Sequence, residues 1–146
     1  MTISTRDNVC LAAANHAIGT TTSKSRTTTN VCHYVIDGRA YFKAATDDLF
    51  TLSGTALAAN EVCAFFLMLD SSGTASVEQS AIKKASTATS GYEAGAFAWP
   101  DPASKAVVGA LLIKSGGSAF TPGTTALTSV ATYINVALDY GKPIAY

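Results

Sequence analysis

Charged side chains are scarce in this sequence of 146 residues. Asp, Glu, Lys and Arg make up 14% of the chain, against about 25% in an average soluble protein. Ten basic and ten acidic residues cancel to a formal net charge of zero. A nucleic-acid-binding protein needs a basic excess that displaces counterions, so this balance argues against a nucleic-acid partner. Because hydrophobic residues reach 48%, the composition also excludes a disordered chain.

Long apolar runs are missing as well. The longest, residues 62–69, is far shorter than the roughly 20 residues of a membrane-spanning helix. The first residues show no basic stretch followed by an apolar core, so we expect no signal peptide. We therefore expect no membrane partner and a protein that is made in a cytoplasm.

Cysteine and histidine are too few for the usual metal and catalytic patterns. Cys10, Cys32 and Cys63 are an odd number without paired spacing, which predicts buried reduced thiols rather than a zinc site. A catalytic base can be imagined at His33 beside Asp37, but no nucleophile motif accompanies it. We predict that the protein is not an enzyme, has no catalytic or metal-binding residue and uses no cofactor.

Two acidic clusters are candidate calcium ligands. Asp47-Asp48 and the sequence Asp70-Ser-Ser-Gly resemble fragments of an oxygen-rich loop. Calcium takes six to eight oxygen ligands, and the full loop pattern is absent. We expect these carboxylates to serve in turns and caps.

Two segments predict β-hairpins. Asp37-Gly38 lies between the β-favouring runs 31–36 and 39–45, and this dipeptide suits the two positive φ angles of a type I′ turn. The apolar run 61–70 is followed by a Ser-Ser-Gly turn and an alternating segment. The run could form a buried strand or a buried helix, and its setting favours the strand.

Further short strands are expected at 49–52, 105–114 and 130–138, and Pro122-Gly123 suits a type II turn. Thr occurs 19 times and Ala 26 times, and Thr favours strands over helix interiors. No strand–helix alternation and no internal repeat is visible. The sequence predicts an all-β fold, an antiparallel β-sandwich or barrel of jelly-roll type.

The N-terminal part differs in composition from the rest. Residues 5–17 could form a short helix, and the following polar, Thr-rich stretch carries Lys24 and Arg26 without an acidic residue. Such a segment orders against a partner or not at all. We predict a flexible N-terminal arm at 1–30, extended or partly helical, and a β domain at 31–146.

Aromatic side chains gather in the long loop 83–104 and in the C-terminal tail. Aromatic residues in such places often anchor protein interfaces, although Phe97 and Trp99 could instead plug one end of the sandwich. Exposed aromatics would also suit a sugar-binding platform. The candidate interface residues are Lys24, Arg26, Tyr92, Phe97, Trp99, Tyr140 and Tyr146.

The order of features over residues 31–137 resembles small β-rich structural proteins of tailed-bacteriophage virions. The segments that carry this resemblance are 37–44, the strand end 69–74, then 107–113 and 120–127. The resemblance implies a β-rich, non-enzymatic virion protein and fits a capsid protein as well as a fibre or tail component. Among these we predict a capsid decoration or cement protein. The resemblance also implies a homo-oligomer, with trimers common in such roles, and the major capsid protein or another virion protein as partner. The alternative is a tail or head fibre component that acts as a receptor- or glycan-binding module.

Low charge and zero net charge agree with this reading, because they suit large self-complementary contacts and remove repulsion between copies. A surface with few charges is expected to be covered in part by other protein.

Overall fold

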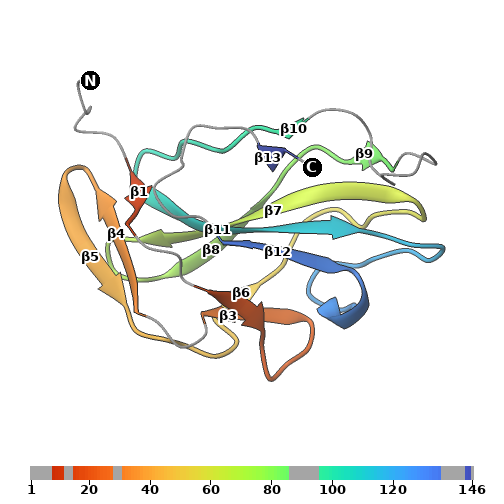
Figure 1. Cartoon of the computed structure of the whole chain (residues 1–146), viewed down its shortest axis with the longest axis horizontal. Helices are drawn as coiled ribbons and strands as arrows, with labels where there is room; N and C mark the ends of the chain where they lie inside the picture. The colour runs from red at the N-terminus through yellow and green to blue at the C-terminus, as the bar shows by residue number, and fades with distance from the viewer. Residues whose placement is uncertain (1–7, 12–14, 28–30, 86–95, 136–143, 146) are drawn as a thin grey trace.

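The computed structural model describes residues 8–11, 15–27, 31–85, 96–135 and 144–145. Their strands form four antiparallel sheets (Figure 1). The all-β prediction is confirmed, and the described strands do not close into a barrel. One short 3₁₀-helix, Leu127–Ser129, accompanies them. None of the described residues form a helix with the length and hydropathy of a membrane span.

The strands are β1 (Val9–Cys10), β2 (His16–Ile18), β3 (Lys24–Thr27), β4 (Cys32–Ile36), β5 (Arg39–Lys43), β6 (Phe50–Thr51), β7 (Glu61–Asp70), β8 (Ala75–Gln79), β9 (Lys83–Lys84), β10 (Ala96–Phe97), β11 (Lys105–Lys114), β12 (Ala131–Asn135) and β13 (Ile144–Ala145).

The largest sheet runs in the order β12-β11-β7-β8, with β9 also paired to β7. Strands β7 and β11 have the bounds expected from their apolar runs, and both are buried along eight consecutive positions. They lack the usual polar alternation because both faces of the sheet are covered. One face joins the main core, which includes Phe65 and Leu111, and the other carries a second cluster, which includes Phe66 and Met68.

Both predicted hairpins are confirmed. Strand β4 pairs with β5 across Asp37-Gly38, whose φ angles of +50° and +76° are those of a type I′ turn. Strand β7 pairs with β8 across the Ser-Ser-Gly turn. Farther along the chain, Gly123 has φ +75°, and the Thr124 N–H donates to the Thr121 carbonyl at 3.2 Å, as a type II turn requires.

A β-bulge interrupts the pairing of β7 with β11 between Val107 and Gly109. The ring of His16, which is 5% exposed, packs against Gly109, and a Cβ at that position would lie 2.2 Å from its Nε2 atom. The His16 Nε2–H donates to the Val108 carbonyl at 2.9 Å, so this ring nitrogen carries the proton. The same ring packs edge-on against Phe50, with 5.4 Å between centroids.

The N-terminal residues extend two small sheets. Strand β1 pairs with β4 in the sheet β1-β4-β5, and β3 pairs with β6 in the sheet β2-β3-β6. The helix considered at 5–17 is wrong in its described part, because β1 and β2 form there with partners that satisfy their backbone groups. These strand pairs cross the boundary expected near residue 30, which stays a prediction.

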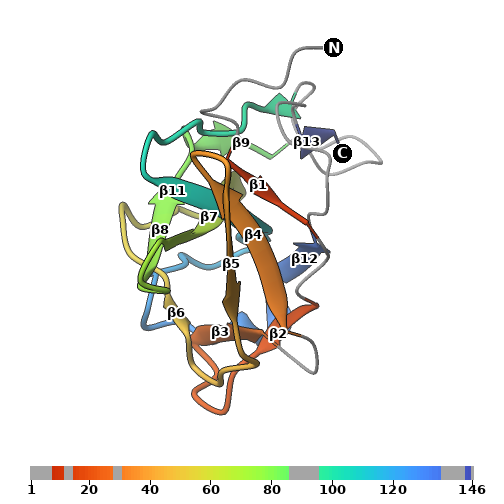
Figure 2. The ribbon, with the colours of Figure 1, turned by 90° about the vertical axis from the view of Figure 1, so that its left-hand side faces the viewer.

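The sheet β1-β4-β5 lies at one end of the molecule and packs its inner face on the large sheet (Figures 1 and 2). Cys10, Cys32, Tyr34 and Ile36 supply that inner face and are buried in the main core. The Tyr34 hydroxyl donates to the Asp70 carbonyl at 2.8 Å, which ties β4 to the end of β7.

Candidate interaction face

The outward side of the sheet β1-β4-β5 is defined by its register. Residues directly opposite each other in an antiparallel pair point to the same side of the sheet. Val35 lies opposite both Val9 and Ala40, and His33 lies opposite Phe42. Leu11 and Val31 continue the alternation, and the Leu11 N–H donates to the His33 carbonyl at 2.8 Å. We call the set Val9, Leu11, Val31, His33, Val35, Ala40 and Phe42 the outer face.

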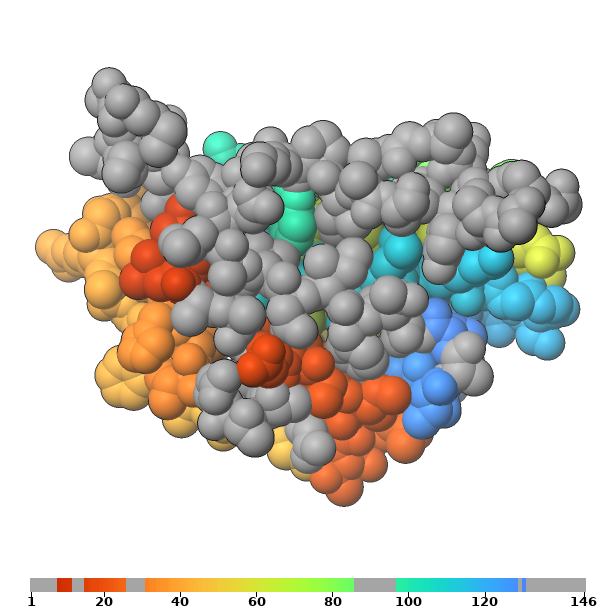
Figure 3. Space-filling view, viewed as in Figure 1, coloured from red at the N-terminus to blue at the C-terminus, as the bar shows by residue number. Residues whose placement is uncertain are grey.

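The outer face is apolar and open to solvent. Phe42 is 70% exposed, Val31 41% and Leu11 39%, and these three are the large hydrophobic side chains that are exposed among the described residues. No Asp, Glu, Lys or Arg belongs to the set. A sheet face that meets water normally alternates apolar-in with polar-out, so an uncharged outward side points to a contact surface. Figure 3 shows the hairpin that carries much of this face, in orange, at one end of the molecule.

Local sequence explains why the face turns outward. In β4 the pattern of buried and open positions alternates strictly, with Cys32, Tyr34 and Ile36 inward. In β5 Tyr41 is half-buried and stacks on Tyr34, with 5.8 Å between ring centroids. This stacking holds Phe42, the next residue, on the opposite side of the sheet, where its ring lies 6.5 Å from that of His33.

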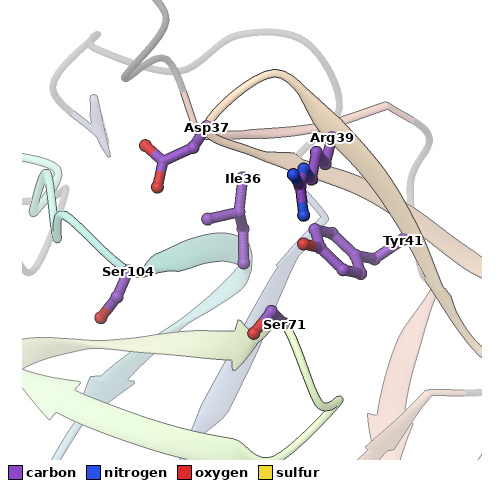
Figure 4. A pocket seen from close by; sticks show the side chains of 6 residues that line it. All are labelled: Ile36, Asp37, Arg39, Tyr41, Ser71 and Ser104. Carbon is purple, nitrogen blue, oxygen red and sulfur yellow. The ribbon is translucent and has the colours of Figure 1, made fainter.

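A hollow of about 360 Å³ opens beside the turn of the same hairpin (Figure 4). Its lining combines Asp37, Arg39 and Tyr41 from the hairpin with Ser71 and Ser104 from two other loops, over Ile36. Within the described part of the chain, these five polar side chains make no hydrogen bond or ion pair through their side-chain ends. The hollow therefore offers donors and acceptors to a small polar molecule.

The interface residues expected from the sequence do not gather on the outer face. Lys24 is half-buried in β3, and Arg26 lies in the same strand. Phe97 is 3% exposed and covers the second face of the large sheet, together with the half-buried Trp99, whose ring lies 5.2 Å from that of Phe66. The predicted residues Tyr92, Tyr140 and Tyr146 lie outside the described residues.

Sequence reasoning missed that Phe42 is exposed on the outer face. The sequence already indicates which side chains share a side of this hairpin. In any hairpin centred on Asp37-Gly38, Phe42 and His33 lie on the same side as Val35. Without the burial of Tyr34 on the large sheet, however, neither side of the hairpin could be assigned to solvent.

Sequence reasoning also missed that Cys10 and Cys32 meet. The two buried thiols hydrogen-bond, and this bond, with burial, raises the pKa of Cys32 far above its ordinary value. Burial raises the pKa of Cys63 to about 11. All three thiols are free, and the raised pKa values of Cys32 and Cys63 keep these two thiols protonated and poorly nucleophilic.

The acidic residues weighed as calcium ligands are used in turns. The Thr20 and Thr21 N–H groups donate to the carboxylates of Asp47 and Asp48, at 3.0 and 2.9 Å. The Asp70 carboxylate accepts from the N–H groups of Ser72 and Thr74, both at 2.9 Å. The bond from Thr74, with that from the Ser72 hydroxyl, holds the pKa of Asp70 below its ordinary value. No group of three or more metal-ligating side chains occurs among the described residues.

Comparison of the chain with known protein families, with curated proteins and with solved structures finds no match.

Proposed function

We propose that this chain is a non-enzymatic structural subunit of a virion, a capsid decoration protein that stabilises the particle through contacts between β domains. The observation that carries the proposal is the outer face. It places the three exposed large hydrophobic side chains of the described residues on one small sheet. Burial of such a face against protein is favourable by roughly 25 cal/mol for each Å² removed from water.

The outer face is small, and a contact of this size is effective only when many copies of the chain bind side by side. Strands β1, β4 and β5 together contain twelve residues. Strands rise about 3.3 Å per residue and lie about 4.8 Å apart, so this sheet covers roughly 190 Å². A stable isolated interface needs about 800 Å² on each partner. A weak contact becomes strong when many copies sit side by side, because each bound neighbour raises the effective concentration of the next. A capsid lattice supplies that arrangement.

The fold fits the same role. We infer that the sheet β1-β4-β5 and the large sheet form a sandwich of jelly-roll type, because both contribute to the main core. The short strands leave the remaining surface to loops, where further contacts with a major capsid protein could form. The chain's net charge of zero removes repulsion between crowded copies.

The test begins with virions purified from a culture in which the gene for this chain is expressed. Mass spectrometry and cryo-electron microscopy should find the chain in many copies on the outside of the particle. Recombinant native chain should bind stripped particles, and a Phe42→Asp variant should bind at least tenfold more weakly while it unfolds at the same urea concentration. Absence of the chain from purified particles would refute the proposal.

The hollow beside Asp37 favours a second candidate, a fibre component that binds a glycan. Its carboxylate, guanidinium and hydroxyl groups match the hydroxyls of a single sugar unit in number and polarity. The platform of exposed aromatics loses support, because Phe97 is buried. Saturation-transfer NMR with simple hexoses should then give signals that an Arg39→Ala variant lacks, and silence from every hexose counts against this candidate.

A further inference from the structure

Along β5 the outward-facing side chains are one large residue, Phe42, with an alanine two residues before it and another two residues after it. Phe42 is 70% exposed, and Ala40 and Ala44, two residues before and after it, are also exposed. Residues two apart in an extended chain point to the same side, so the ring of Phe42 projects beyond the single methyl group of Ala40 beside it. A surface with a projection beside a depression can fit onto a copy of itself.

We propose that the outer face docks onto the outer face of a second copy of this chain, with Phe42 of each copy seated over Ala40 of the other. The inference rests on the proposed function only in taking the outer face as the contact surface. A two-fold axis between the sheets makes the contact reciprocal, so each copy supplies one projection and one depression. Packed sheets lie about 10 Å apart, a spacing that one phenylalanine facing one alanine can fill.

The charge pattern supports a second copy as the occupant. The outer face contains no Asp, Glu, Lys or Arg, and its one polar side chain is the imidazole of His33, so two such faces can meet without burying a carboxylate, an ammonium or a guanidinium ion. Without these groups the face has little electrostatic basis on which to select a charged partner. The chain as a whole has no net charge, so two copies approach without long-range repulsion.

Pairing through the open edge of β5 is disfavoured for two copies. An antiparallel pair centred on Tyr41 would set Arg39 of each copy directly opposite Lys43 of the other. Like charges in directly opposite positions destabilise a sheet, and a lysine on an edge strand is a known guard against such pairing. The edge is thus protected by its own charges, whereas the outer face is not.

The size of the face sets the strength of the contact. Roughly 190 Å² of sheet on each copy is well below the about 800 Å² per partner of a stable interface, so the contact is weak. We therefore expect monomers at a few micromolar and reversible dimers at several hundred micromolar.

The test is analytical ultracentrifugation of the full chain from about 5 to 500 μM. Ala40→Glu fills the depression with a charge, and Phe42→Ser removes the projection. Both variants should remain monomeric at concentrations where the native chain is mostly dimeric. Ala119→Glu adds the same charge at an exposed position outside the face, and this control should dimerise as the native chain does. Urea unfolding of each variant checks that the fold is retained.

Two results would overturn the inference. A native chain that stays monomeric at 500 μM has no such contact, and an Ala40→Glu variant that dimerises normally uses another surface.

Particle binding distinguishes a failure of this inference from a failure of the proposed function. If the native chain is monomeric but Phe42→Asp loses particle binding, the face contacts another virion protein and only the self-docking fails. If dimers form through the face and the chain is absent from particles, only the virion role fails.

Discussion

Gly109 and His16 provide the sharpest test of how the N-terminal strands join the core. A Cβ added at Gly109 would lie 2.2 Å from His16 Nε2 and 2.3 Å from Cδ2. Ordinary contacts between such atoms begin near 3.5 Å, so the ring would have to move by more than an ångström. Its hydrogen bond to the Val108 carbonyl and its packing on Phe50 both oppose that movement.

The cost of Gly109→Ala follows from two effects. Overfilling a packed site costs about 1–3 kcal/mol. Displacing the His16 ring also breaks a buried hydrogen bond, at a further cost of about 1–2 kcal/mol. The φ angle of Gly109 lies outside the left-handed region, so no backbone strain adds to the sum. We expect the free energy of unfolding to fall by about 2–5 kcal/mol.

A double-mutant cycle isolates the cause. In a His16→Ala background the three atoms nearest to the added methyl group are gone, and alanine in a strand interior is favoured over glycine by about 0.5–1 kcal/mol. Gly109→Ala should then be neutral or slightly stabilising. Urea unfolding followed by circular dichroism gives all four stabilities. Equal destabilisation by Gly109→Ala in both backgrounds would refute the proposed packing of His16 into the bulge.

Two further predictions concern the hairpin end of the molecule. Asn8 is 8% exposed and donates to the carbonyls of Pro102 and Lys105, both at 2.8 Å, while it accepts from the Asp37 N–H at 3.1 Å. Asn8→Ala should lower the free energy of unfolding by about 2 kcal/mol, and a urea midpoint that does not move would contradict this role. Asp70 has a lowered pKa in the folded chain, so its contribution to stability is full above about pH 5 and is lost as the pH falls through that folded pKa. The stability difference between the native chain and Asp70→Asn should shrink in the same acid range, and a difference that is constant from pH 6 to pH 2.5 would contradict the assignment.

Turn chemistry explains why so much of the strand pattern could be predicted. Asp37-Gly38 adopts two positive φ angles at little cost, so the hairpin of β4 and β5 is encoded locally. The runs that became β7 and β11 are apolar over their full length, and their ends are marked by charged residues and turns. Local rules suffice there because neighbouring residues and tertiary packing favour the same conformation.

The N-terminal segment shows where local rules are insufficient. The flexible arm indicated by its Thr-rich composition stays a prediction, but the strand Lys24–Thr27, which lies between β2 and β6, was not expected from the sequence. Pairing on both sides supplies the hydrogen bonds that a polar segment cannot obtain alone. The partner strand β6 lies about 25 residues farther along the chain, so no window around the segment contains the cause.

The sequence by itself determined the all-β class, the two hairpins and the shortage of charge, because these depend on composition and on residues that are close along the chain. Only the tertiary structure decided which side of each sheet meets water. Phe97 was expected in an interface and is buried on the second face of the large sheet, whereas Phe42 was overlooked and is 70% exposed. The same kind of side chain has opposite surroundings at these two positions, because burial depends on which distant strands lie above it.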